Sequence, residues 1–209
     1  MLAAIESFRQ ALRRHAPDFG FQLKESEIER LGGYYRLLLK WNPRLHLVAP
    51  CSPEEFATRH VLESLLLLPH LTQAARVTDV GSGGGLPIIP CLTMRPDLRV
   101  TLIESSQKKA VFLREALRQF NEPEPPRLLV GRFEEVAAPA ADFITCRALD
   151  RFQEVLPGLI DWAPPLSTLL LFGGPALVKM IEGLIPSVRA ELIAGSEQRF
   201  LIIARQGDA

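Results

Sequence analysis

Residues 77–87 read Val-Thr-Asp-Val-Gly-Ser-Gly-Gly-Gly-Leu-Pro and decide the fold of this 209-residue chain. The apolar run that ends at Val80 is typical of a buried strand, and Pro87 suits the first turn of a helix. Between them, four of the five residues 81–85 are glycines, which let a backbone turn sharply and approach a ligand closely because they lack a Cβ. In doubly wound parallel sheets, ligands bind at this position, beyond the carboxyl end of a strand.

The spacing of the glycines separates three interpretations of the loop. A purely structural turn needs fewer glycines than this loop contains. A dinucleotide-binding loop has the spacing G-x-G-x-x-G, and its last position is Leu86 here. Glycines at every second position match instead the G-x-G-x-G loop of S-adenosylmethionine-dependent methyltransferases, and these are Gly81, Gly83 and Gly85.

Two acidic residues support a nucleoside-containing ligand. Asp79 precedes the loop and favours a cationic cofactor, and Glu104 follows the next apolar run, where a carboxylate can bind ribose hydroxyls. NAD-dependent enzymes use an acidic residue at the same place. An NAD-dependent oxidoreductase therefore remains an alternative, disfavoured by the glycine spacing.

Downstream of the loop, short apolar runs alternate with helical stretches. This rhythm predicts a doubly wound, mainly parallel sheet. We expect its seven strands at Val77–Val80, Arg99–Ile103, Leu128–Val130, Phe143–Cys146, Leu169–Phe172, Ala190–Ile193 and Phe200–Ala204. The last two are separated by a short gap, so they can pair antiparallel.

Upstream of residue 76 the periodicity is helical. Leu2, Ile5, Phe8 and Leu12 share one face of a first helix. A second helix is expected from a capping box of Ser26 and Glu29 to Asn42-Pro43, with two glycines inside it. A third is expected from Ser52, with Pro53 at its first position and Glu55 completing the box, to residues 65–68.

Composition limits the class of protein. The chain is 47% hydrophobic and 23% charged, with three cysteines and no C-x-x-C pair, which is typical of a globular protein with reduced thiols and without a bound metal. No apolar run reaches the ~18 residues of a spanning helix, and no signal-peptide core opens the sequence. We therefore expect a monomeric, cytoplasmic protein that does not bind membranes. The 24 basic and 24 acidic residues balance, which leaves only a local basic rim for attracting RNA.

Residues 79–90 resemble the glycine loop of the bacterial small-subunit ribosomal RNA guanine-N7 methyltransferases, the RsmG or GidB family. The prolines Pro87 and Pro90 are more particular to that family than the glycines are. Further segments match over roughly residues 30–150, namely Lys40-Trp41-Asn42, Arg59-His60-Val61-Leu62-Glu63-Ser64, Arg95-Pro96-Asp97, Lys108-Lys109, Phe112-Leu113-Arg114, Gly131-Arg132-Phe133-Glu134-Glu135 and Cys146-Arg147-Ala148.

The resemblance implies a Rossmann-like class I methyltransferase fold. Its seven-stranded, mainly parallel sheet would occupy residues 76–209, and residues 1–75 would form an N-terminal helical extension. The cofactor would be S-adenosylmethionine, and the substrate 16S ribosomal RNA or the small ribosomal subunit. The product would be a guanine methylated at N7.

The resemblance also assigns roles to residues. It places the cofactor against Gly81, Leu86, Phe133-Glu134 and Arg147, and the residues themselves add Asp79, Gly83, Gly85 and Glu104. Arg147 would lie between cofactor and substrate and is the expected catalytic residue. Contacts to RNA are expected from Arg59, His60, Lys108, Lys109 and Arg132. Ordinary alternatives stay open: Phe133 can be core, Lys108 and Lys109 can be solvated, and Arg59 can simply pair with Glu63 four residues on.

The chain departs from the family pattern at two places. The family carries a lysine followed by glycine after the fifth strand, where this chain reads Leu171-Phe172-Gly173-Gly174-Pro175. It also has His46 and Val48 where the family has asparagine and threonine. Both changes concern the substrate side. A non-catalytic ribosome-binding protein with a retained cofactor pocket is therefore a second alternative.

Overall fold

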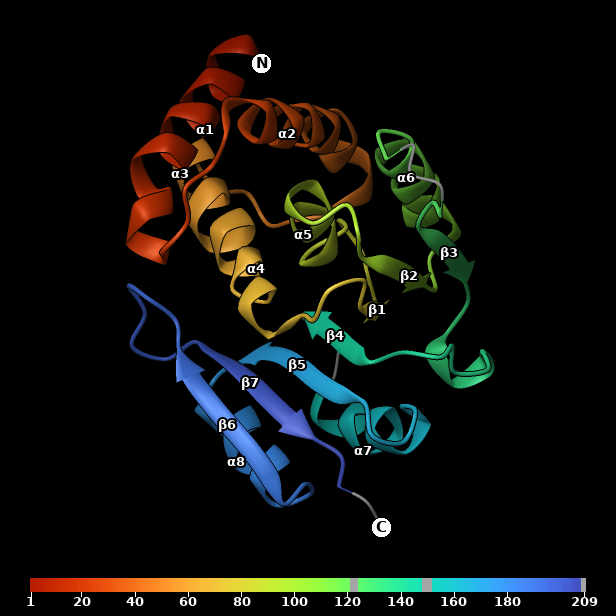
Figure 1. The fold of residues 1–209 in the computed structure, drawn as a ribbon. Coiled ribbons are helices and arrows are strands. Elements are labelled where there is room, and N and C mark those ends of the chain that lie inside the picture. Colours follow the sequence, from red (N-terminus) through yellow and green to blue (C-terminus); the bar gives the residue numbers. More distant parts are fainter. Residues whose placement is uncertain (121–123, 148–151, 208–209) are drawn as a thin grey trace.

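In the computed structural model, residues 1–120, 124–147 and 152–207 are described. Seven strands form one sheet in the order β3-β2-β1-β4-β5-β7-β6. Strands β1 to β5 are parallel, whereas β7 runs antiparallel to both of its neighbours (Figure 1). The strands are β1 Arg76–Val80, β2 Arg99–Glu104, β3 Arg127–Val130, β4 Phe143–Arg147, β5 Thr168–Gly173, β6 Ser187–Leu192 and β7 Phe200–Arg205. The expected sheet and the antiparallel pairing of its last two strands are confirmed.

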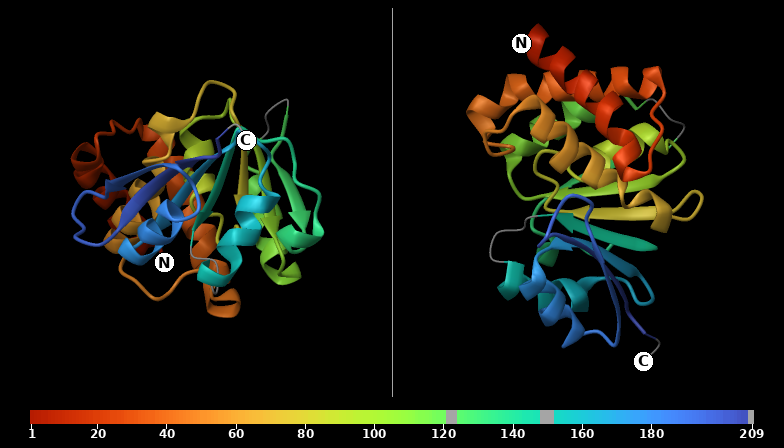
Figure 2. Two further views of the ribbon diagram at one scale, coloured as in Figure 1. Left: turned by 90° about the horizontal axis from the view of Figure 1, so that it is seen from below. Right: turned by 90° about the vertical axis from the view of Figure 1, so that its left-hand side faces the viewer.

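Helices cover both faces of the sheet. Those that follow β1 in the chain are α5 Ile88–Met94, α6 Gln107–Leu117, α7 Phe152–Trp162 and α8 Pro175–Glu182. Helices α5 and α6 lie on the face that also carries the N-terminal extension, and α7 and α8 lie on the opposite face (Figures 1 and 2). The extension consists of α1 Leu2–His15, η1 Ala16–Phe19, α2 Glu25–Leu45, α3 Pro53–Glu55, η2 Phe56–Leu62, α4 Glu63–Leu65 and η3 Leu68–His70.

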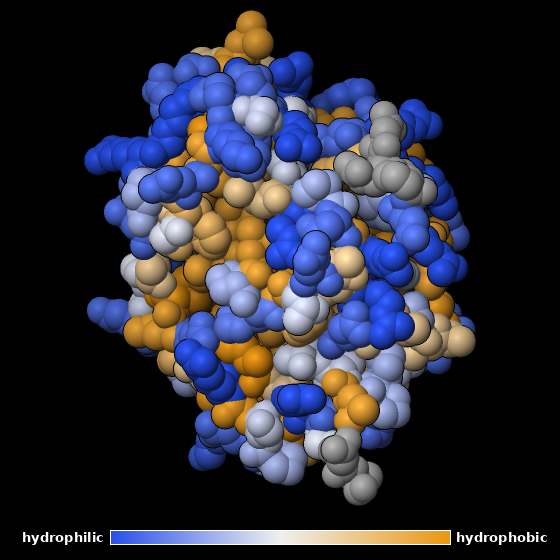
Figure 3. Space-filling model, in the orientation of Figure 1, coloured by the Kyte–Doolittle hydropathy of each residue, from blue (hydrophilic) through white to orange (hydrophobic). Residues whose placement is uncertain are grey.

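Alternation along the strands produces two cores. In β5, Leu170 and Phe172 belong to the core under the extension, whereas Leu169 and Leu171 belong to the core under α7 and α8, as the period of two in a strand requires. The first core runs without interruption from Ile5 in α1 to the sheet, and apolar residues show at the surface where the extension meets the strands (Figure 3). The extension and the sheet thus share one hydrophobic core.

Two details of the helical extension differ from expectation. Helix α2 begins at Glu25, because the carboxylate of Glu27, rather than a box of Ser26 and Glu29, accepts the backbone N–H of Lys24 at 2.7 Å. It also continues through Pro43 to Leu45, and it ends where His46 adopts a left-handed conformation with φ of 49°. Proline disfavours helical geometry in the residue before it, yet Asn42 and Pro43 both lie within α2.

The third helix begins as expected. The Ser52 hydroxyl accepts the N–H of Glu55 at 3.0 Å, and Pro53 occupies the first turn. Its middle, η2, is a seven-residue π-helical segment between two α-helical turns, which the periodicity did not predict. Such bulges widen the helix locally and are frequent at functional sites.

Some statements from the sequence fall outside the described ranges. Ala148 of the Cys146-Arg147-Ala148 segment is one such residue. Within the described residues, no helix is both long and apolar enough to cross a membrane. In the same ranges no three side chains of the kinds that bind metals come together.

Candidate functional site

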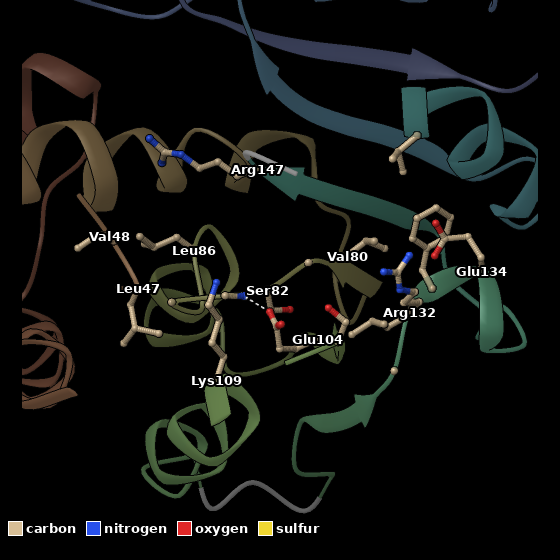
Figure 4. Close-up of a pocket in the computed structure, with 18 of the residues that line it drawn as sticks. Leu47, Val48, Val80, Ser82, Leu86, Glu104, Lys109, Arg132, Glu134 and Arg147 are labelled. Carbon is tan, nitrogen blue, oxygen red and sulfur yellow. Dashed lines mark hydrogen bonds between the residues drawn. The ribbon is translucent and has the colours of Figure 1, made fainter. Parts of the chain in front are cut away.

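A cavity of about 530 Å³ opens at the carboxyl ends of β1, β2 and β4. Its volume is in the range of small-molecule sites. The lining residues come from the glycine loop, the ends of β2 and β3, Arg147, and two parts of the extension (Figure 4). The sequence-predicted residues that line it are Gly81, Gly83, Leu86, Glu104, Phe133, Glu134, Arg147, His60, Lys109 and Arg132. Asp79, Gly85, Arg59 and Lys108 are not among its lining residues.

The glycine loop needs its glycines for conformation and for space. Gly81, Gly83 and Gly85 have φ of 71°, 52° and 81°, values that side chains rarely adopt. At Gly85 a Cβ would lie 2.2 Å from Cδ1 of Ile89. Gly85 therefore supports the loop by close packing against α5 rather than by lining the cavity.

Glu104 anchors the loop from β2. This residue is 5% exposed, and its carboxylate accepts the N–H of Gly83 and the N–H of Ser106, each at 2.7 Å; the first of these bonds is the dashed line in Figure 4. A carboxylate has about four acceptor positions. The two that remain can accept the hydroxyls of a ribose placed in the cavity.

Asp79 lies at the end of β1, directly beneath the loop. It is fully buried, and neither carboxylate oxygen has a hydrogen-bond partner within the described residues. Burial, with the charge of Glu104 as a smaller cause, raises the pKa of Asp79 to about 7. An unpaired buried carboxylate is costly, so a cationic ligand that reaches it would relieve that cost.

Asp79→Asn is expected to flatten the pH dependence of folding stability. Because the folded state raises the carboxyl pKa, it binds the proton more tightly than the unfolded state does, and stability falls as the pH rises from about 4 to about 7. Asparagine does not titrate. In the absence of cofactor, the thermal unfolding midpoint of the variant minus that of the wild type should therefore be larger at pH 8 than at pH 5 by about 5 °C or more. Thermal scans of both proteins across this pH range check the prediction. If Asp79 were ionised throughout, the midpoints of the two proteins would change in parallel with pH, which would contradict it.

The far wall of the cavity follows β3. Phe133 is 5% exposed and packs edge-on against Trp162, with ring centroids 5.5 Å apart. It belongs to the second core and also lines the cavity, so the structural and functional interpretations are compatible. Glu134 and Arg132 are exposed beside it, and Figure 4 shows the Arg132 guanidinium on the cavity side.

Arg147 joins the sheet to the extension. Its guanidinium donates to the Glu63 carboxylate at 3.2 Å, to the backbone carbonyl of His60 at 3.3 Å, and to that of Arg59. It also lies 5.3 Å from the ring centroid of Phe172. Figure 4 shows the guanidinium directed toward the helix of the extension. Arg147 therefore lines the cavity with its side chain while its charge is held at the cavity's edge.

Glu63 is the centre of this ionic cluster. It is 2% exposed, and its other oxygen accepts two bonds from Arg199, at 2.8 and 3.1 Å. The alternative in which Arg59 pairs with Glu63 is wrong: Arg59 pairs with Glu55, one turn earlier. Glu63 pairs instead with Arg147 of β4 and with Arg199, just before β7. These two arginines compensate the charge of the buried carboxylate.

A second cavity, of about 630 Å³, adjoins the first and shares Arg147 with it. Arg59, Arg199 and the Gly173-Gly174 backbone also line it. The sequence carried no signal for Arg199, a single arginine before the last strand. The stretch that lacks the family's lysine thus borders a cavity that three arginines line.

The remaining candidates differ in their surroundings. His60 lines the first cavity, and burial, helped by the charges of Arg147 and Arg59, lowers its pKa to about 4. Its ring is therefore neutral near pH 7. Lys108 and Lys109 begin α6 as expected, but only Lys109 lines the cavity, whereas Lys108 is exposed outside it.

The residues of the loop after α2 were not among the predicted site residues, although the departures at His46 and Val48 pointed to the substrate side. Leu47, Val48 and Ala49 line the first cavity. The Asn42 side chain holds this loop, because it donates to the carbonyl of Val48 at 3.1 Å and accepts its N–H at 3.0 Å.

Comparison with known proteins agrees with this arrangement. The GidB family model, described as rRNA small subunit methyltransferase G, matches residues 27–172. The chain belongs to the GidB family. A family member from Xanthomonas axonopodis pv. citri, named Ribosomal RNA small subunit methyltransferase G, is 38% identical over 83% of this chain and 84% of its own. One of the same name from Neisseria meningitidis is 37% identical over 76% of this chain and 74% of its own.

Solved structures share the fold of this GidB-family chain. A methyltransferase from Pyrococcus furiosus covers 86% of the chain and 99% of its own with a TM-score of 0.59 at 14% identity. An RNA methyltransferase from Salinibacter ruber, solved with S-adenosyl-L-homocysteine, covers 78% and 95% with a TM-score of 0.55 at 16% identity. At these identities the likeness concerns the fold alone.

The GidB motif Lys40-Trp41-Asn42 has a structural explanation. Trp41 donates its indole N–H to Glu115 of α6 at 2.9 Å, Lys40 lies 3.5 Å from the same carboxylate, and Asn42 holds the loop that lines the cavity. The motif therefore attaches the extension to α6 and holds the loop that lines the cavity.

Proposed function

We propose that this GidB-family chain transfers a methyl group from S-adenosylmethionine to N7 of a guanine in 16S ribosomal RNA, free or within the small subunit. The observation that carries the proposal is the glycine-loop cavity, which the buried carboxylate of Glu104 lines. Family membership supports the choice of ribosomal RNA as substrate. We further propose that the protein acts as a monomer in the cytoplasm.

The residues fit the cofactor. Glu104 keeps two free acceptor positions for the ribose, and Phe133 offers an apolar ring for adenine. Asp79 does not line the cavity, but its buried carboxyl has no hydrogen-bond partner among the described residues and lies beneath the loop, where a cationic methionine part would favour its ionised form. A dinucleotide would instead require the first N–H groups of a helix to be free to receive a pyrophosphate. Here Leu86 and Pro87 lie between the glycines and the start of α5, and Pro87 has no N–H to offer.

When bound, the cofactor supplies a methyl group on a sulfonium. Guanine N7 has a free lone pair and no proton, so the protein needs no general base, and rate enhancement comes from positioning the reactants. The neutral His60 ring, with its pKa of about 4, agrees with a binding role rather than an acid–base one. Arg147, at the edge between the two cavities, is placed to bind guanine O6 or a phosphate, since N7 must face the methyl group.

The RNA has to present its base outside a helix. The deep, narrow major groove of A-form RNA hides N7, so the target must be a loop base or one flipped into the site. The second cavity, with Arg59, Arg147 and Arg199, suits the phosphates that flank such a base. These arginines would supply positive charge beside the stretch after β5 that lacks the family's lysine.

Binding of S-adenosylhomocysteine tests the cofactor assignment. Calorimetry on the full chain should show binding of this ligand and none of NAD. The reverse preference would contradict the proposal and favour the oxidoreductase alternative.

Lys109→Gln is expected to weaken RNA binding in a salt-dependent way. Lys109 faces the cavity, so losing its charge should reduce the slope of log K against log salt concentration by about 0.7. Lys108→Gln is the matched control, since it removes the same charge one residue away outside the cavity, and it should change the slope less. Filter binding to small-subunit RNA between low and physiological salt measures both. Equal effects of the two variants would place the RNA elsewhere.

A further inference from the structure

Tyr34 joins the N-terminal extension to the glycine loop. It lies in α2, is 1% exposed, and its hydroxyl donates to the carbonyl oxygen of Gly84 at 2.6 Å. Burial raises the pKa of this hydroxyl, so it stays protonated and able to donate. The bond connects residues 50 positions apart and therefore fixes one part of the fold to another.

The rest of the loop is held from the sheet or by itself. The N–H groups of Gly81 and Ser82 bond to the carbonyl of Ile103, that of Gly83 bonds to Glu104, and that of Gly85 bonds to Ser82. The Gly84 carbonyl is held from the extension instead. Because glycines have many accessible conformations, a loop built from them depends on such external contacts to keep one.

Leu47, in another segment of the extension, lies close to Gly84. A Cβ on Gly84 would lie 3.4 Å from the carbonyl oxygen and 3.5 Å from the Cβ of Leu47. Leu47 belongs to the loop that Asn42 holds through Val48, and Figure 4 shows it on the extension side of the cavity. One segment of the extension thus bonds to the glycine loop, and a second lies close enough to fill the space that a side chain at residue 84 would need.

We infer that Tyr34 is a positioning residue of the cofactor site, which holds the glycine loop from the extension in the conformation that binds S-adenosylmethionine. The extension then completes the cofactor site as well as bordering the RNA. That the ligand is S-adenosylmethionine rests on the proposed function. That Tyr34 fixes the conformation of the glycine loop does not depend on it.

Tyr34→Phe tests the inference, with Tyr35→Phe as its matched control. Tyr35 is the next residue of α2, is 3% exposed, and stacks with its ring on Phe8 and Phe56. Each variant loses one hydroxyl from the same helix, but only Tyr34→Phe leaves the Gly84 carbonyl without its donor. Calorimetry should show binding of S-adenosylhomocysteine weakened about tenfold by Tyr34→Phe and less than about twofold by Tyr35→Phe.

Two further readouts separate positioning from mere stabilisation. In methyl transfer, Tyr34→Phe should raise the KM for S-adenosylmethionine while kcat at saturating cofactor stays near the wild-type value. Hydrogen exchange of the free protein should be faster in residues 81–86 of Tyr34→Phe, with the strands of the sheet unchanged. Unchanged affinity together with unchanged loop exchange would overturn the inference. If the wild type binds no S-adenosylhomocysteine, the proposed function fails, and the exchange measurement still decides whether Tyr34 holds the loop.

Discussion

Arg147→Ala is expected to lower methyl transfer to small-subunit ribosomal RNA by about a hundredfold or more, because it removes the cation at the edge of the two cavities and a contact that positions the extension. It should also destabilise the fold. Glu63 is 2% exposed and, among the residues that the structure describes, would keep only Arg199 as a charged partner. Breaking a buried pair in this way costs about 3 kcal/mol, which chemical denaturation of the variant can measure.

The double variant Arg147→Ala with Glu63→Gln separates the two roles. The second substitution removes the carboxylate that the first leaves undercompensated, so stability should partly recover. If Arg147 contacts the reactants, turnover stays lost in the double variant. Turnover that recovers together with stability would show that Arg147 acts only as a structural link.

Glu104→Gln is expected to weaken binding of S-adenosylhomocysteine by about a hundredfold. An amide retains a single acceptor oxygen, so it cannot hold both Gly83 and Ser106 as the carboxylate does, and it offers less to the ribose. Losing charge-assisted hydrogen bonds at a buried position accounts for an effect of this size. Calorimetry provides the measurement.

Glu135→Gln is a suitable control for that experiment. Glu135 is exposed at the end of the short helix η4, Phe133–Glu135, and does not line the cavity, so its loss tests whether any nearby negative charge suffices. Affinity should stay within about twofold of wild type. Equal weakening by the two variants would mean that Glu104 attracts the cofactor only through its charge and makes no specific contact.

The fold was predictable where local patterns determine it. Short apolar runs separated by helical stretches located the seven strands to within a few residues, and the Ser52 cap was visible in the sequence. The end of α2 was not, because a proline tolerated in a last turn cannot be told from one that stops a helix. The π-helical segment η2 was also missed, since one extra residue in a turn leaves the apolar period almost unchanged.

The candidate site was predictable in its cofactor half. Glycine spacing and the two strand-end carboxylates indicated Gly81, Gly83 and Glu104, which the structure brings to one cavity. Contacts between distant segments were beyond the sequence: Tyr34 with Gly84, and Glu63 with Arg147 and Arg199. Nothing local in a buried tyrosine or a helical glutamate says which distant group it meets. Their partners emerge only when the extension packs on the sheet.

Methyl transfer from labelled S-adenosylmethionine, followed by mapping of the modified base, tests the central claim most directly. The full chain would be incubated separately with free small-subunit RNA and with small subunits isolated from cells that lack the activity. The account predicts label at N7 of one guanine with at least one of these substrates. Label on another base or atom, or no label although S-adenosylhomocysteine binds, would contradict it, and the latter result would favour the non-catalytic alternative.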